Sequence, residues 1–223
     1  MSGDEIRDVT IAPVGLAGTL QISRAAYAVI LFAHGSGSSR FSPRNRAVAE
    51  ALNAQGFATL LFDLLTEDEE ADRANVFDIP LLADRLVDAV RFLDRDPWAA
   101  GVPLGLFGAS TGAAAALVAA AMTGDRVGAV VSRGGRPDLA GAALREVRTP
   151  TLLIVGGADT GVIELNEQAL AQLQGPKALE IVPGASHLFP EPGALDAVIE
   201  HAARWFKHYL AAAPAARDHA KRT

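Results

Sequence analysis

Residues 108–112 read GASTG and join an apolar run over residues 102–107 to an alanine-rich run over residues 113–121. They are the only match in the chain to Gly-x-Ser-x-Gly. A strand that turns sharply into a helix strains the residue at the turn, so the residues two before and two after it must be small. The strain exposes the serine hydroxyl, and the motif therefore predicts Ser110 as a nucleophile. The alternative is a serine that only caps a helix.

Apolar runs and helical periodicities alternate along the rest of the chain. Strands are expected over residues 28–33, 57–62, 103–107, 127–131, 151–155 and 178–182, after a hairpin over 5–11 and 14–22. Helices are expected over residues 43–55, 79–93, 111–122, 162–173 and 194–210. This alternation predicts an α/β fold with a mostly parallel sheet flanked by helices. We expect one domain over residues 1–210 and a frayed tail over residues 211–223.

Composition excludes several classes of protein. The 223 residues are 50% hydrophobic, carry a net charge of −6, and include no cysteine, which excludes disulfides and a thiolate nucleophile. No basic stretch suggests a nucleic-acid partner, and no apolar run is long enough to span a membrane. The charged N-terminus lacks the apolar segment of a secretory signal, so we expect a cytoplasmic protein. The acidic run over residues 67–70 is expected to be a solvated loop.

A serine nucleophile needs a base, and the base needs a carboxylate that orients it. Of the histidines after Ser110, His187 follows the last expected strand, whereas His201 and His208 lie on the last helix and His219 in the tail. Asp159 follows the strand over residues 151–155 directly and is the expected acid. The alternatives are that Asp159 caps the next helix, or that Asp63, which precedes the serine in the chain, takes this role.

Developing negative charge needs hydrogen-bond donors. Residues 34–39, HGSGSS, follow the strand over residues 28–33, and their small side chains leave backbone N–H groups free. We expect the N–H groups of Ser36 and Thr111 to form an oxyanion hole, because one donor should come from the residue after the nucleophile. A phosphate-binding loop is the alternative, although the stretch matches neither GxxxxGK[ST] nor GxGxxG.

Four arginines follow strands or loops at the expected catalytic edge. Arg133 and Arg136 come after the strand over residues 127–131, and Arg40 and Arg44 follow the oxyanion loop. Guanidinium groups at this edge could hold a carboxylate or a phosphate of the substrate. The alternative is that they are surface arginines or partners of the chain's excess acidic residues.

These stretches together resemble the α/β-hydrolase fold over about residues 10–210. The resemblance implies Ser110 as nucleophile, Asp159 as acid, His187 as base and an oxyanion loop at His34-Gly35. Only residues 132–138 stand where many members insert a lid, so the chain resembles the small, lidless dienelactone hydrolase group, whose type member has cysteine as nucleophile. It is also similar to hydrolase domains fused to bacterial phosphoribosyltransferases, in HGSGSSRFSPRN, FDLL, GASTGAAAAL and SRGGRPDL (residues 34–45, 62–65, 108–117 and 132–139).

The sequence therefore predicts a serine hydrolase that cleaves a small carboxylic ester through an acyl-enzyme. Neither a cofactor nor a metal is required by this mechanism. An acyltransferase or thioesterase on the same triad, and a non-catalytic interaction domain that retains the fold, stay open as alternatives. The expected partner is a small ester, possibly anionic, and the sequence leaves the oligomeric state open.

Overall fold

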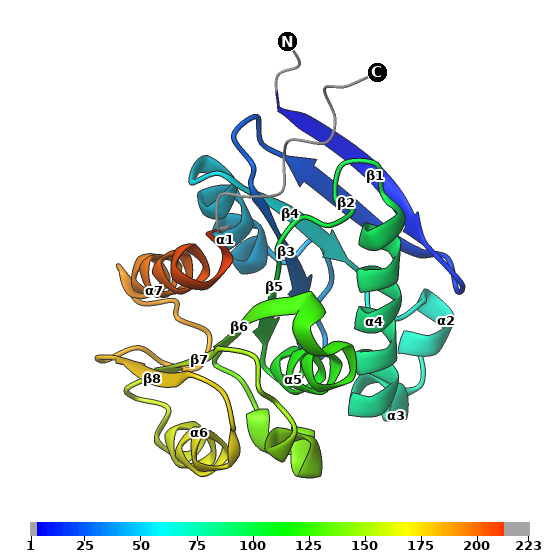
Figure 1. The fold of residues 1–223 in the computed structure, drawn as a ribbon. Coiled ribbons are helices and arrows are strands. Elements are labelled where there is room, and N and C mark those ends of the chain that lie inside the picture. The colour runs from blue at the N-terminus through cyan, green and yellow to red at the C-terminus, as the bar shows by residue number, and fades with distance from the viewer. Residues whose placement is uncertain (1–3, 212–223) are drawn as a thin grey trace.

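The computed structural model describes residues 4–211, which form an eight-stranded sheet flanked by helices (Figure 1). The strand order is β1-β2-β4-β3-β5-β6-β7-β8. The first two strands form an antiparallel hairpin that joins β4 antiparallel, and all other neighbouring strands are parallel. The strands are β1 (Glu5–Ile11), β2 (Leu16–Ile22), β3 (Ala28–Ala33), β4 (Phe57–Phe62), β5 (Leu104–Ala109), β6 (Val127–Arg133), β7 (Thr151–Gly156) and β8 (Lys177–Val182).

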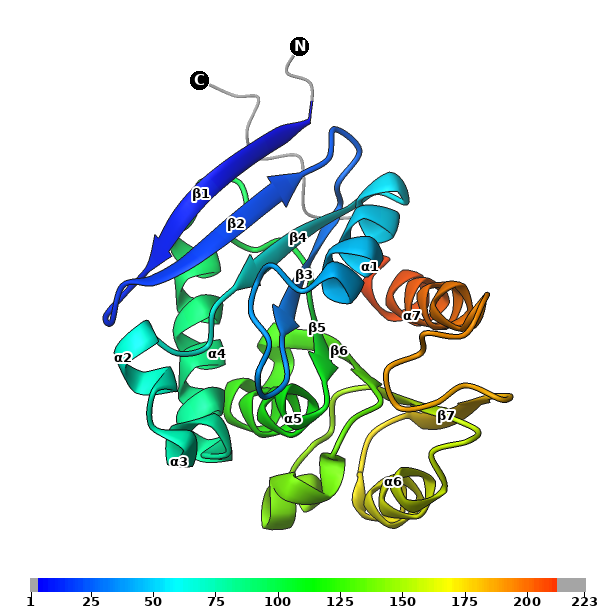
Figure 2. The ribbon, with the colours of Figure 1, turned by 180° about the vertical axis from the view of Figure 1, so that it is seen from behind.

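The helices cover both faces of the sheet, as Figure 2 shows from behind. They are α1 (Pro43–Ala54), α2 (Glu67–Glu70), α3 (Arg73–Val76), α4 (Ile79–Arg95), α5 (Thr111–Thr123), α6 (Thr160–Gln172) and α7 (Ala194–Leu210), with 3-10 helices η1 (Gly124–Arg126) and η2 (Pro137–Arg145). Buried side chains of α1 and α7 pack on one face, and those of α4, α5 and α6 pack on the other. The predicted α/β architecture is confirmed.

The sequence pattern explains these elements. Every residue of β3, β4, β5 and β7 is buried, as expected of strands covered on both faces. Helix α4 buries Leu82, Leu86, Val90 and Leu93, which recur at intervals of three and four residues. Alanines fill the first turns of α5 and let that helix approach the sheet closely.

Two elements differ from the expectation in ways that affect the site. Strand β6 continues to Arg133, beyond the predicted end at residue 131, because its last residues pair with the end of β5. The segment between β6 and β7 contains η2, which packs against α5 and α6 and does not form a lid domain. Arg133 is consequently a strand residue buried in the sheet and not a loop residue.

The acidic run over residues 67–70 was expected to be a loop, and this was wrong. It forms the single-turn helix α2, whose N-cap Thr66 accepts a hydrogen bond from the Glu69 N–H while the Glu69 carboxylate accepts one from the Thr66 N–H. This reciprocal capping and the favourable placement of acids in a first turn stabilise a short helix despite its charge. Among the described residues, no helix is long and apolar enough to cross a membrane.

Candidate active site

The carboxyl ends of the central strands meet at one edge of the sheet, where the candidate site lies. Ala33 of β3 pairs with Gly108 of β5, Ala109 of β5 with Arg133 of β6, and Arg133 with Ile154 of β7. Ligand sites of open α/β sheets form at this edge because the loops that leave the parallel strands gather there.

Ser110 is the one residue between β5 and α5, and its backbone is strained. Its φ is 52° and its ψ is −123°, a conformation that L-residues rarely adopt. Although it occupies the N-cap position, its side chain makes no capping hydrogen bond. The capping alternative for Ser110 therefore fails.

Glycines make this turn possible. A Cβ on Gly108 would lie 2.5 Å from the Ala113 Cα, and a Cβ on Gly35 would lie 2.8 Å from the Ser110 Cβ. Real side chains do not approach so closely, so the sheet, the turn and the oxyanion loop pack as closely as they do only because these positions lack a side chain.

Asp159 and His187 meet at the same edge from two different loops. The Asp159 Oδ2 lies 2.6 Å from the His187 Nδ1, in the distance range of a charge-assisted hydrogen bond. Asp159 stands at the N-cap position of α6 but makes no capping hydrogen bond. Its carboxylate therefore orients the imidazole, and the alternative that it caps the helix is excluded.

Ser110 and His187 line one pocket of about 620 Å³, together with Gly35, the loop that follows it and Arg133. In the described part of the chain the Ser110 hydroxyl forms no hydrogen bond, so it is free to turn toward the imidazole. Nucleophile and base are often loosely aligned before substrate binds. The structure thus brings to one pocket the serine and the histidine that the sequence pattern selects.

The two expected oxyanion donors lie side by side, with one difference from the prediction. The Ser36 N–H was expected to be free, but it donates a hydrogen bond to the Thr111 Oγ1 at 3.0 Å. The Thr111 N–H belongs to the first residue of α5, where a helix offers no acceptor. The Thr111 hydroxyl thus connects the oxyanion loop to the nucleophile helix.

His34 holds the base of the oxyanion loop. Its Nδ1 lies 3.0 Å from the Gly35 carbonyl oxygen, and its Nε2 lies 3.0 Å from the Leu64 nitrogen. Because the Leu64 N–H can only donate, Nε2 accepts and the proton sits on Nδ1, which makes the ring neutral. Burial lowers the pKa of His34 below its usual value, more strongly than the Gly35 carbonyl and the nearby Asp63 raise it.

This pairing predicts a loss of stability in acid. Because the pKa of His34 is lower in the folded chain than the usual value of about 6.5, its contribution is fully present above about pH 6.5 and is lost as the pH falls toward the lowered pKa. Urea unfolding at pH 7, 6 and 5 should show a smaller decline in the free energy of unfolding for His34→Gln than for the wild type. Parallel declines would contradict this role.

The structure separates the arginines proposed for substrate binding. Arg40 forms an ion pair with Asp63, and Arg136 forms a two-pronged pair with Asp138 at 2.9 and 2.7 Å. The charge of each is therefore balanced within the chain. Arg133 is 6% exposed, lines the pocket beside Ser110, and has no acidic partner in the described chain.

Two neighbours of Arg133 come from the start of α1. The Arg133 Nη2 donates to the Asn45 Oδ1 at 3.1 Å, and Arg44 lines the same pocket. The sequence analysis did not select Asn45. The available signal was a polar residue on the core-facing side of a helix, which needs a partner when it is buried.

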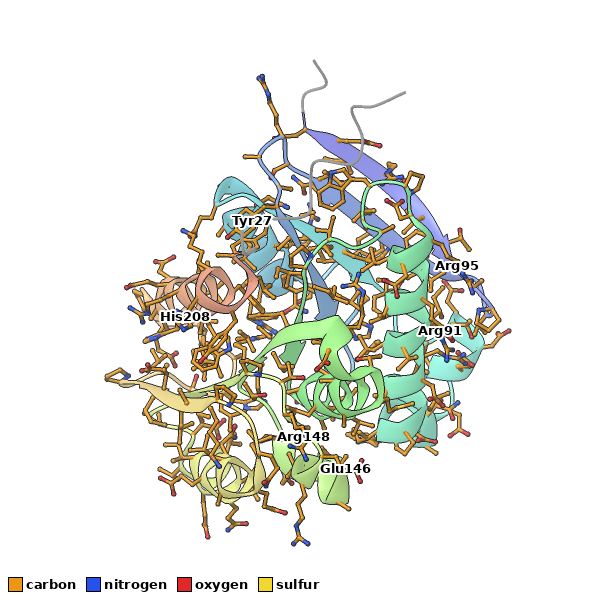
Figure 3. All side chains as sticks on the ribbon, viewed as in Figure 1. Tyr27, Arg91, Arg95, Glu146, Arg148 and His208 are labelled. Atoms are coloured by element: carbon orange, nitrogen blue, oxygen red, sulfur yellow. The ribbon has the colours of Figure 1, made fainter. Side chains whose placement is uncertain are left out.

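The remaining histidines lie elsewhere. His201 contacts Arg204 and Glu180, and His208, labelled in Figure 3, is an exposed residue of α7. His219 lies outside the described residues, as does nearly all of the expected tail. Within residues 4–211, no three His, Cys, Asp or Glu side chains are grouped as metal ligands would be.

Comparison with known proteins identifies the family. The model of the dienelactone hydrolase family matches residues 16–213. The chain belongs to this family. A crystal structure of dienelactone hydrolase from Anabaena variabilis is 56% identical, with a TM-score of 0.90, over 94% of this chain and 100% of that one. Family and fold make this dienelactone hydrolase family member a hydrolase of the α/β type.

Two further relatives place this family member more broadly. It is 58% identical to a Mycobacterium tuberculosis protein named "Putative phosphoribosyl transferase", over 93% of this chain but only 47% of the relative. The chain thus spans about half the length of that relative. Est1E from Butyrivibrio proteoclasticus shares the fold, with a TM-score of 0.77 at 16% identity over 95% of this chain and 100% of that one.

Proposed function

We propose that this protein is a serine esterase that acts through Ser110, His187 and Asp159. The observation that carries the proposal is the 2.6 Å pairing of Asp159 with His187 in the pocket that the strained Ser110 lines. A carboxylate held on Nδ1 leaves Nε2 as the basic nitrogen, which is the tautomer that a serine nucleophile needs.

The reaction follows from these roles. His187 Nε2 takes the hydroxyl proton as the Ser110 oxygen attacks the ester carbonyl, and the imidazolium then gives that proton to the leaving alcohol. Water enters, loses a proton to His187 and attacks the acyl-enzyme, which releases the acid and restores the serine. No oxidant, metal or cofactor takes part in these steps. The substrate is a small carboxylic ester.

The oxyanion is stabilised by donors from α5 and the loop before it. The Thr111 N–H lies next to the nucleophile, and the N-terminus of α5 adds the positive end of its dipole. The Ser36 N–H is the second donor, and the Thr111 hydroxyl holds it in place in the free enzyme. Losing one such donor costs roughly 3–4 kcal/mol of transition-state stabilisation in comparable sites.

A fluorophosphonate probe tests the proposal, because it reacts covalently only with an activated serine. We expect the wild type to be labelled and Ser110→Ala to remain unlabelled. Ser36→Ala, which changes an exposed side chain and keeps the backbone N–H, is the matched control and should still be labelled. No labelling of the wild type would favour a non-catalytic domain, and labelling that survives Ser110→Ala would place the nucleophile elsewhere.

A further inference from the structure

The positive charge of Arg133 is buried next to the nucleophile without a counter-charge. Its Nη2 donates to the neutral amide of Asn45, while its Nε is buried and has no hydrogen-bond partner. Burial lowers the pKa of Arg133 to about 10, and no carboxylate offsets this effect. A buried charge is costly unless it is paired, so this arrangement calls for an anion from outside the described chain.

Arg44 adds a second positive charge at the same place. Its Nε is also buried without a partner, and its proximity further lowers the pKa of Arg133. Ten salt bridges occur in the described chain, and neither arginine takes part in any of them. Two like charges held together strengthen the case for an anionic ligand between them.

The N-terminus of α1 faces the same pocket. Ser42, Pro43, Arg44 and Asn45 all line it, and α1 is a helix of 12 residues. Ser42 accepts a hydrogen bond from the Asn45 N–H, and Pro43 has no N–H. The Arg44 N–H is left without an acceptor, and the helix dipole is positive here. Free N–H groups at a helix start bind phosphate readily.

We propose that this pocket binds a phosphate monoester group carried by the substrate, held by Arg133, Arg44 and the start of α1. The inference deepens the proposed esterase and rests on it only for the role of Ser110. Charge balance selects the ligand: two unpaired guanidinium groups are neutralised by a phosphate dianion, whereas one carboxylate would leave a net positive charge buried. Among the described residues that line the pocket, none is aspartate or glutamate.

The scissile ester lies next to this group. The Ser110 N–H points at the Arg133 carbonyl oxygen at 3.4 Å, and Ser110, His187 and Arg133 share the pocket. A substrate whose phosphate is bound by the arginines therefore presents its ester within a few bonds of the nucleophile. Binding energy from such a non-reacting group can be used to orient the ester for attack.

Calorimetric titration of inorganic phosphate tests the site directly, at pH 8 and constant ionic strength. The protein is Ser110→Ala, so binding is read without any turnover. We expect phosphate to bind, and Arg44→Met in that background to weaken binding at least tenfold, because a charge-assisted pair is lost. Arg46→Met changes an exposed arginine two residues along α1, outside the pocket, and should bind phosphate as before.

Further variants and ligands keep the result decisive. Arg133→Lys retains the charge without the planar fork and should also weaken binding, while Arg44→Met serves if changes at Arg133 prevent folding. Acetate that binds as tightly as phosphate, or no binding of phosphate, would overturn the assignment. Phosphate binding in a protein that resists fluorophosphonate would leave the phosphate site standing and reject the esterase, and the opposite pattern would reject only the phosphate site.

Discussion

Asp159→Asn is expected to lower kcat for ester hydrolysis by about 10⁴-fold while the fold is retained. The carboxylate accepts a hydrogen bond from the His187 Nδ1–H and stabilises the imidazolium that forms when the ring takes the serine proton. The neutral amide of asparagine can donate to Nδ1 instead, which moves the ring proton to Nε2 and removes the basic nitrogen. Steady-state kinetics with a 4-nitrophenyl ester, beside a thermal unfolding curve, measures both quantities.

Asp63→Asn is the matched comparison, because Asp63 also follows a central strand and is the competing acid. Its carboxylate pairs with Arg40 and accepts from the Arg40 N–H at 2.8 Å, so it is committed to the oxyanion loop and not to His187. We expect a loss in kcat below about tenfold. A loss from Asp63→Asn that equals the loss from Asp159→Asn would transfer the orienting role to Asp63.

Gly112→Ala is expected to cost at least about 3 kcal/mol in the free energy of unfolding, together with most of the activity. A Cβ there would lie 2.3 Å from the Ala33 carbonyl oxygen and 2.4 Å from that of His34. Both atoms are backbone at the end of β3, so the clash can be relieved only by moving α5 away from the sheet. That movement displaces Ser110 and the oxyanion loop together. Urea unfolding measures the change.

Gly161→Ala provides the matched control for this substitution. Gly161 is the second residue of α6, after a threonine, just as Gly112 is the second residue of α5 after Thr111. A Cβ at Gly161 meets no atom within 4 Å, and alanine favours a helix by up to about 1 kcal/mol over glycine. Its stability should stay equal or rise slightly. Similar losses at both glycines would show that close packing at Gly112 is not the cause.

The order of strands and helices was predictable because burial on both faces leaves a continuous apolar run that is visible in sequence. The position of the nucleophile was predictable as well, since a tight turn between a strand and a helix demands glycine on both sides of one residue. The end of β6 was missed because Ser132 and Arg133 are polar. They continue the strand only because β5 lies beside them and pairs with them.

The partners of the polar side chains were decided by tertiary structure. Sequence spacing did not determine that Asp159 would turn from its helix to His187, or that the Ser36 N–H would be taken by Thr111. It also gave four arginines the same appearance, although Arg40 and Arg136 meet carboxylates while Arg44 and Arg133 meet none.

The sequence by itself determined the α/β architecture and the residue at the strained turn, because both depend on local periodicity and local steric limits. The tertiary structure alone decided which charges are neutralised and which stay available to a ligand. Electrostatic pairing depends on the distance and direction between side chains from separate strands, and the distance along the chain carries no information about either.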